Sequence, residues 1–110
     1  MCDPRILCRQ HLLGEHNELH KIVGSLQKER SISGYIKHNC IEVKSILNRH
    51  ELLIEEMIKR GYNHRSPLPS FNYSYLPLVE QIYVIDRENS LQDLINRCNK
   101  CNTRYKEAMK

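Results

Sequence analysis

Apolar residues recur with the 3.6-residue period of an amphipathic helix in three segments of the chain. In the first segment the periodic stripe consists of Leu12, His16, Leu19, Val23 and Leu26. Asp3 and Pro4 precede it as a capping residue and a proline suited to a first helical turn. The first predicted helix therefore begins close to the start of the chain.

The second and third segments show the same rhythm. The second stripe consists of Val43, Ile46, Leu47, His50, Ile54, Met57 and Ile58. Gly61 follows it and suits the left-handed conformation that ends many helices. The third stripe consists of Leu91, Leu94, Ile95, Cys98, Asn102 and Tyr105, after a start at Ser90 and Asp93 that resembles a capping box. We predict an all-α fold, a compact single domain of three main helices spanning residues 1–110.

Two connections separate these helices. Residues 30–39 are polar and read as a turn with a short helical piece at residues 35–38. Residues 62–89 hold three of the four prolines and five of the seven aromatic residues, with no strong period. A loop of this length in a small domain usually covers the core or carries function. We predict a cover with a functional edge.

The composition narrows the classes of protein. A chain of 110 residues with 40% hydrophobic and 27% charged residues has room for one core and is not typical of disordered proteins. No apolar run is long enough to span a membrane and no secretory signal is evident, so we expect an intracellular protein in the cytoplasm, the nucleus or a virus-infected cell. Five cysteines without an export signal indicate reduced thiols. The net charge of +4 permits a polyanionic partner without requiring one.

One flank of the first predicted helix could carry chemistry. His11, Glu15 and Glu18 follow one another at helical spacing along the edge of the apolar stripe. Such a group can transfer protons, bind a metal or simply be solvated, and spacing alone does not decide between these uses. Gly14 in the same helix costs about 1 kcal/mol relative to alanine and suggests close approach by a backbone or a ligand.

Cys98 and Cys101 have the spacing of a zinc or redox pair, but they lie inside a predicted helix with Cys98 on its apolar side. We interpret them as two buried or half-buried thiols, although His64 or Cys8 could complete a metal site in space. A basic group follows the second helix at Lys59, Arg60, His64 and Arg65. Basic residues there complement the helix dipole, or they form a strip for phosphate contacts.

Two strings in the sequence resemble the phage endonuclease V type of pyrimidine-dimer DNA glycosylase. Residues 9–19 (RQHLLGEHNEL) are similar to the family's first-helix signature, and residues 55–63 (EEMIKRGYN) to the end of its second long helix. The two strings occur in the family's order, and the family's compact all-α fold agrees with the three predicted helices.

The resemblance implies an enzyme with two activities on damaged duplex DNA. Family members flip nucleotides, attack the anomeric sugar carbon with the N-terminal α-amine, release the base through a Schiff base and cut the strand by β-elimination. It implies that Glu18 is the catalytic carboxylate and that the nucleophile is the amine of Cys2, or of Met1 if the methionine is retained. It also implies a pyrimidine dimer as the lesion, no metal or organic cofactor, no membrane and a monomer.

The same resemblance implies a surface that binds DNA. His11 and Glu15 match neighbours of the catalytic carboxylate, Lys21 stands where a basic contact is expected, and Asn17 replaces the family's arginine. The predicted DNA-binding residues are His11, Glu15, Asn17, Lys21, Lys59, Arg60, Tyr62 and Asn63.

The short start of the chain sets a geometric condition. A straight helix from Pro4 to Glu18 would leave the amine roughly 20 Å from that carboxylate, given the rise of about 1.5 Å per residue. We therefore predict a bend or loop near residues 7–10 that folds the N-terminus back, or else a lost activity or a misassigned start codon. The alternatives are a catalytically degenerate relative that binds DNA or a protein, abasic-site trapping by Cys2 as a thiazolidine, and a zinc-stabilised module around Cys98 and Cys101.

Overall fold

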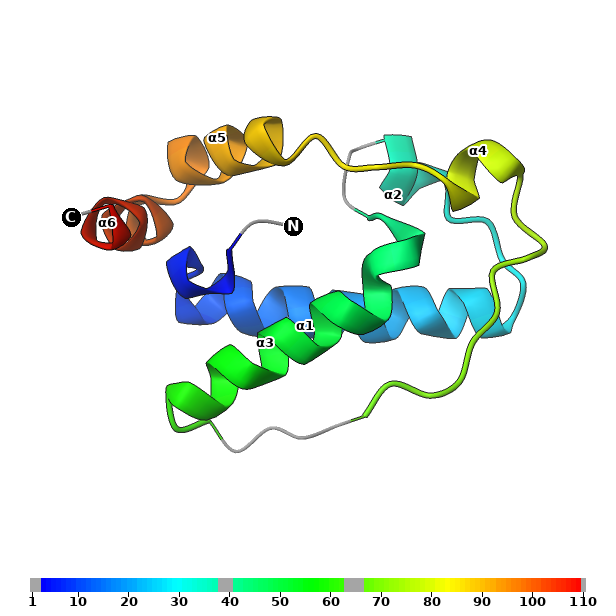
Figure 1. Ribbon diagram of the computed structural model, residues 1–110, viewed down its shortest axis with the longest axis horizontal. Helices are drawn as coiled ribbons and strands as arrows, with labels where there is room; N and C mark the ends of the chain where they lie inside the picture. The colour runs from blue at the N-terminus through cyan, green and yellow to red at the C-terminus, as the bar shows by residue number, and fades with distance from the viewer. Residues whose placement is uncertain (1–2, 38–40, 63–66, 110) are drawn as a thin grey trace.

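The computed structural model describes residues 3–37, 41–62 and 67–109, which form six α-helices and two 3₁₀ helices and no strand (Figure 1). In chain order these are η1 (Pro4–Ile6), α1 (Arg9–Gln27), α2 (Ser33–Lys37), η2 (Val43–Ser45), α3 (Ile46–Lys59), α4 (Leu78–Gln81), α5 (Arg87–Arg97) and α6 (Asn99–Ala108). The prediction of an all-α fold is confirmed. None of the helices in the described ranges has the length and apolar character needed to cross a membrane.

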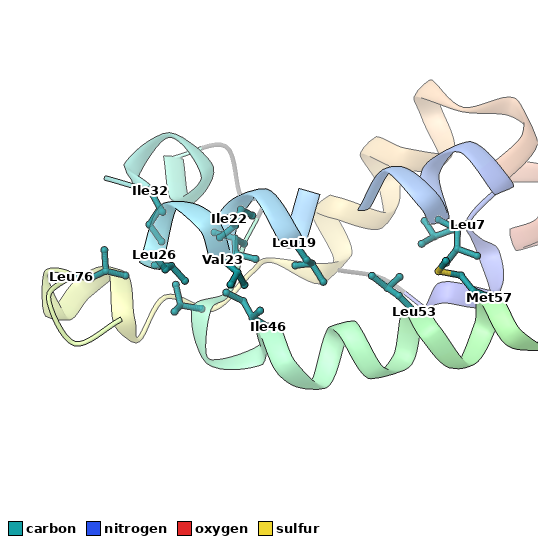
Figure 2. Close-up of a cluster of buried hydrophobic side chains, with 13 residues drawn as sticks. Leu7, Leu19, Ile22, Val23, Leu26, Ile32, Ile46, Leu53, Met57 and Leu76 are labelled. Carbon is teal, nitrogen blue, oxygen red and sulfur yellow. The ribbon is translucent and has the colours of Figure 1, made fainter. Parts of the chain in front are cut away.

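The core lies mainly between α1 and α3, which cross in Figure 1 and between which the buried side chains are drawn in Figure 2. Leu12, Leu19 and Ile22 of α1 are almost completely buried, as are Leu53 and Met57 of α3. Burial of each such side chain is worth roughly 1.5–3 kcal/mol. The stripe predicted for the first helix is buried throughout. The second stripe is confirmed only in part, because Leu47 and Ile58 are exposed on the outer side of α3 and Val43 lies in η2.

The end of α3 follows the sequence pattern closely. Gly61 has a φ of +81°, the left-handed conformation that glycine adopts without strain. The Gly61 N–H donates to the carbonyl of Ile58 at 3.0 Å, and the Tyr62 N–H donates to that of Met57 at 2.9 Å. This pair of bonds is the Schellman motif, which satisfies the last carbonyls of the helix.

The chain bends sharply before α1. Asp3 caps a 3₁₀ turn that begins at Pro4, and its carboxylate accepts from the Arg5 N–H at 3.0 Å. Leu7 and Cys8 are extended, with ψ values of 133° and 168°, and α1 begins only at Arg9. The bend predicted near residues 7–10 is confirmed, and Pro4 begins η1 instead of α1.

The third predicted helix is two helices. Cys98 is extended, with φ −121° and ψ 107°, and it separates α5 from α6. The start of α5 is capped by Asp86, whose carboxylate accepts from the Asn89 N–H at 3.0 Å, so the predicted start at Ser90 and Asp93 was wrong. The break turns α6 across the end of α5 and brings it against η1 (Figure 1).

The segment between α3 and α5 covers the core, as predicted, and contains α4. Leu76 is buried, and Phe71, Tyr73 and Tyr75 pack against the core cluster. The Tyr75 hydroxyl donates to the carbonyl of Arg30 at 2.6 Å, which ties the cover to the end of α1. The short helical piece expected at residues 35–38 corresponds to α2, with residue 38 outside the described residues.

Candidate functional site

A buried ion pair joins the middle of α1 to α3. Arg49 donates through Nη2 to Oε1 of Glu15 at 3.0 Å, and its Nε bonds the other carboxylate oxygen. The Arg49 side chain is only 5% exposed and that of Glu15 is 25% exposed. A bidentate pair of this kind fixes the orientation of both side chains. It holds the flank of α1 that also carries Glu18.

Glu18 lies one turn beyond Glu15 and is half-buried. Burial raises the pKa of the Glu18 carboxyl above its usual value, and the negative charge of Glu15 adds to that effect, while Lys21 partly opposes it. A half-buried carboxylate with a raised pKa is typical of groups that handle protons or stabilise a developing positive charge.

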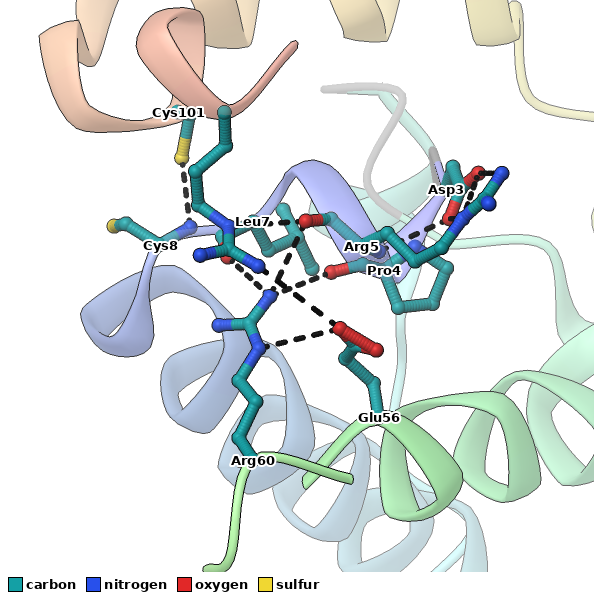
Figure 3. A network of polar contacts seen from close by, with 9 residues as sticks. Asp3, Pro4, Arg5, Leu7, Cys8, Glu56, Arg60 and Cys101 are labelled. Carbon is teal, nitrogen blue, oxygen red and sulfur yellow. Dashed lines mark hydrogen bonds and ion pairs between the residues drawn. The ribbon is translucent and has the colours of Figure 1, made fainter. Parts of the chain in front are cut away.

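Two arginines hold the N-terminal segment through its backbone (Figure 3). Arg60 at the end of α3 donates to the carbonyls of Pro4, Arg5 and Leu7 at 3.2, 3.3 and 2.7 Å. Arg104 of α6 donates through Nε to the Arg5 carbonyl at 3.0 Å. These bonds fix η1 at the junction of α3 and α6.

Glu56 balances these cations. Its carboxylate accepts from Arg60 at 3.3 Å, lies 4.0 Å from Arg104, and is 10% exposed. Glu56 is buried on α3. Its carboxylate contacts the guanidinium of Arg60 on one side, and the carbonyls of the N-terminal segment contact it on the other. The N-terminal segment is therefore held by charge-assisted hydrogen bonds, which are stronger than neutral ones.

A groove of about 570 Å³ opens beside this segment. It is lined by Asp3, Pro4, Ser45, Asn48, Arg49, Leu52, Arg87, Glu88 and Leu91. The Asp3 carboxylate has a lowered pKa, first because Arg5 bonds it and also because of the charge of Arg49. The bend thus returns the beginning of the described chain toward the arginine that holds Glu15.

The outer face of α1 is open. Asn17 and Lys21 are exposed, and so is Gly14. A Cβ built on Gly14 would meet no atom within 4 Å among the described residues, so the expected close approach by a second backbone is wrong there. The space beside Gly14 is open, so the other expectation for this glycine, close approach by a ligand, stays a prediction.

The other predicted DNA-binding residues have varied surroundings. Lys59 is exposed, whereas the guanidinium of Arg60 donates hydrogen bonds to backbone carbonyls of η1 and to that of Leu7. Tyr62 is half-buried, and the Arg9 guanidinium lies 5.2 Å from its ring centroid. Met1, Cys2 and Asn63 are outside the described residues, as is His64. The DNA contacts of this set stay predictions.

The structure brings together four residues that the sequence left apart, namely Cys8, His11, Cys98 and Cys101. The described cysteines are all free thiols, in agreement with the expectation of reduced cysteines. Burial raises the pKa of the Cys101 thiol to about 12. The N–H of Cys101 donates to Cys98 Sγ and lowers the pKa of that thiol. The placement of Cys98 inside a helix was wrong, since it caps α6 instead.

Three histidines form a second cluster, which the sequence analysis missed. The Nε2 atoms of His16 and His50 are 3.1 Å apart, and the ring centroids of His16 and His20 are 4.7 Å apart. Within the described part of the chain, His20 Nε2 is buried without a hydrogen-bond partner. The spacing of four residues between His16 and His20 was a signal, because it places both rings on one face of a helix.

Comparison with known proteins supports the family suggested by the sequence. The profile of the family described as pyrimidine dimer DNA glycosylase matches residues 1–70, which include α1, α3 and the N-terminal segment. No curated protein and no solved structure gave a significant match. The family description implies DNA glycosylase activity and a DNA substrate in general terms. The chain belongs to the pyrimidine dimer DNA glycosylase family.

Proposed function

We propose that the protein removes damaged pyrimidines from duplex DNA and then cuts the abasic strand, using its N-terminal amine and Glu18. The observation that carries this proposal is the bend at Leu7 and Cys8. It returns Asp3 toward Arg49, which bonds Glu15 one turn from Glu18. An N-terminal amine on Met1 or Cys2 would be within two residues of Asp3, so its covalent reach from that residue would be about 7 Å.

The amine suits the first step without help from a buried lysine. An α-amine has a reference pKa of about 7.7–8.0, so on the order of a tenth of it is unprotonated at neutral pH. Its nitrogen forms a bond to the anomeric carbon as the glycosidic bond breaks, and the departing base keeps the electron pair. The carboxylate of Glu18 stabilises the positive charge that develops on the sugar.

The second step follows from the intermediate. A proton moves from the nitrogen to the ring oxygen as the bond between the anomeric carbon and that oxygen breaks, which opens the sugar and leaves a protonated Schiff base. This iminium withdraws electrons from the neighbouring carbon. Removal of a proton from that carbon expels the 3′ phosphate by β-elimination. The carboxylate of Glu18 is suited to accept this proton, because its pKa is raised above the usual value for glutamate.

The test is reductive trapping. Incubation with abasic duplex DNA and borohydride should give a covalent adduct whose peptide map places the link at the amine of Cys2 or Met1. Selective acetylation of that amine should abolish trapping, and mass spectrometry of the intact protein establishes which residue is N-terminal. Glu18→Gln should lose turnover on a pyrimidine dimer substrate. The control is Glu29→Gln, at an exposed glutamate beyond α1, which should keep it.

The remaining outcomes identify the alternatives. Binding to the duplex without trapping or nicking would contradict the proposed chemistry and leave a DNA-binding relative. A stable adduct that forms without borohydride and requires the Cys2 thiol would indicate thiazolidine capture of the aldehyde in place of β-elimination.

A further inference from the structure

We infer that Cys8, His11, Cys98 and Cys101 form a structural zinc site that fastens the C-terminal helix to the N-terminal segment. The four candidate ligand atoms all lie within 4.8 Å of one another. Three thiolates and one imidazole are a common ligand set of structural zinc. The inference is independent of the proposed enzymatic activity.

The distances agree with a tetrahedral ion. With Zn–S of about 2.3 Å and Zn–N of about 2.0–2.1 Å, tetrahedral geometry requires S···S of about 3.8 Å and S···N of about 3.5 Å. Cys8 Sγ and Cys98 Sγ are 3.8 Å apart, and Cys101 Sγ is 3.5 Å from His11 Nδ1. Cys8 Sγ is 3.1 Å from the same nitrogen, so this pair must move apart by about 0.4 Å when an ion binds. All six separations are within 4.8 Å.

The backbone presents the four ligands in two matching pairs. Cys8 occupies the N-cap position of α1, without a cap hydrogen bond from its side chain, and His11 follows three residues later. Cys98 caps α6 through its sulfur, and Cys101 follows three residues later. Side chains at these two positions both point toward the start of their helix, as in a capping box. Two helix N-termini therefore face the same point, and their positive dipole ends favour the thiolate form.

Backbone N–H groups also support the sulfur atoms. The Cys8 N–H donates to Cys101 Sγ at 3.2 Å, and the Cys101 N–H donates to Cys98 Sγ at 3.4 Å (Figure 3 shows the first). The site with zinc carries one net negative charge, and cationic Arg60 bonds the carbonyl of Leu7 next to Cys8 at 2.7 Å. Hydrogen bonds of this kind orient metal ligands and are part of most zinc sites.

The competing explanation is a pair of helix caps packed together without an ion. The variant Cys98→Ser distinguishes the zinc site from the pair of helix caps, because serine is a strong helix cap and a poor zinc ligand. If Cys98 only caps α6, this variant keeps or gains stability. If it binds zinc, the variant loses the metal and the stability that depends on it.

The experiment measures metal by mass spectrometry in protein purified under reducing conditions with zinc supplied and without chelator. The wild type should hold about one zinc per chain, and Cys98→Ser close to none. A strong chelator should lower the melting temperature of the wild type and leave that of Cys98→Ser unchanged. The matched control is His20→Gln, which alters the histidine cluster and should keep its zinc.

Cobalt titration of the wild type makes the test independent of any variant. Tetrahedral thiolate coordination gives visible d–d bands and a thiolate-to-cobalt charge-transfer band in the near ultraviolet. Wild-type protein without zinc and without the charge-transfer band would overturn the inference. So would zinc that is retained by Cys98→Ser and lost from His20→Gln, or a disulfide between these cysteines in the reduced preparation.

Discussion

The carboxyl of Glu18 has a raised pKa and lies one turn from Glu15, whose carboxylate is paired with Arg49. Because burial of Glu18 disfavours its charged form, the carboxyl gains a proton at a higher pH than the usual value of 4.5. The amine also gains a proton as the pH falls, with a reference pKa of about 7.7–8.0. Two protonations therefore oppose the proposed chemistry in acid.

The prediction concerns the pH dependence of kcat/KM. Below the pKa of the amine, log kcat/KM should fall with a slope of about one per pH unit, and below the raised pKa of Glu18 with a slope of about two. The break should lie above pH 4.5, the reference value for glutamate. In Glu18→Gln the residual activity should show only the first slope. A break at or below the reference value would contradict the assigned surroundings of Glu18.

The sequence pointed to some residues of the candidate site and missed others. Glu18 was singled out by its match to the family's catalytic carboxylate, and its catalytic role stays a prediction. Arg49 was missed, although it lies three residues after Ile46 and four before Leu53 on the buried face of α3. A charged residue within an apolar stripe requires a buried partner, so this position carried a signal. The sequence could not name Glu15 as that partner, since the pairing depends on how α1 and α3 cross.

At the scale of elements, η1 depends on Arg60. Arg60→Ala removes the bonds to three carbonyls and leaves the buried Glu56 with only the more distant Arg104. The free energy of unfolding should fall by roughly 2–4 kcal/mol, as measured by urea denaturation. Lys59→Ala is the control, because Lys59 is adjacent and exposed and should change stability by no more than about 0.5 kcal/mol.

The same pair of variants tests the sequence-based expectation that Arg60 contacts phosphate. If Arg60→Ala is as stable as Lys59→Ala but weakens DNA binding equally at every sequence, the phosphate contact is the main role of Arg60. Loss of stability with unchanged affinity in the folded protein would leave η1 as its role.

The periodic pattern predicted α1 and α3 because most positions of their apolar stripes are buried in the core, with Leu47 and Ile58 of α3 as exposed exceptions. It failed at Cys98, where the apolar rhythm continues from α5 into α6 although the backbone breaks. At the break Cys98 contacts Cys8, and α6 beyond it contacts η1, at sequence separations of 90 and 99 residues. Local periodicity carries no information about such contacts.

At the scale of the whole molecule, the net charge of +4 gives attraction to DNA that salt should weaken. Lys21 is exposed beside the open face of α1, so Lys21→Ala should lower affinity for any duplex and reduce the salt slope by about one. Lys37→Ala, at the exposed end of α2, is the control for a change in total charge. Equal effects of the two variants, measured by anisotropy titration over a salt series, would remove Lys21 from the proposed interface.

The bonds that hold η1 also order the events of synthesis. Cys101 and Arg104 follow the carbonyls and N–H groups they contact by 93 and 99 residues. A ribosome must therefore release almost the entire polypeptide before this part of the molecule can close. The hydrogen bonds from Arg60 to the carbonyls of Pro4, Arg5 and Leu7 can form earlier, so during synthesis the N-terminal segment would first be held from the end of α3, and the contacts from α6 would be added last.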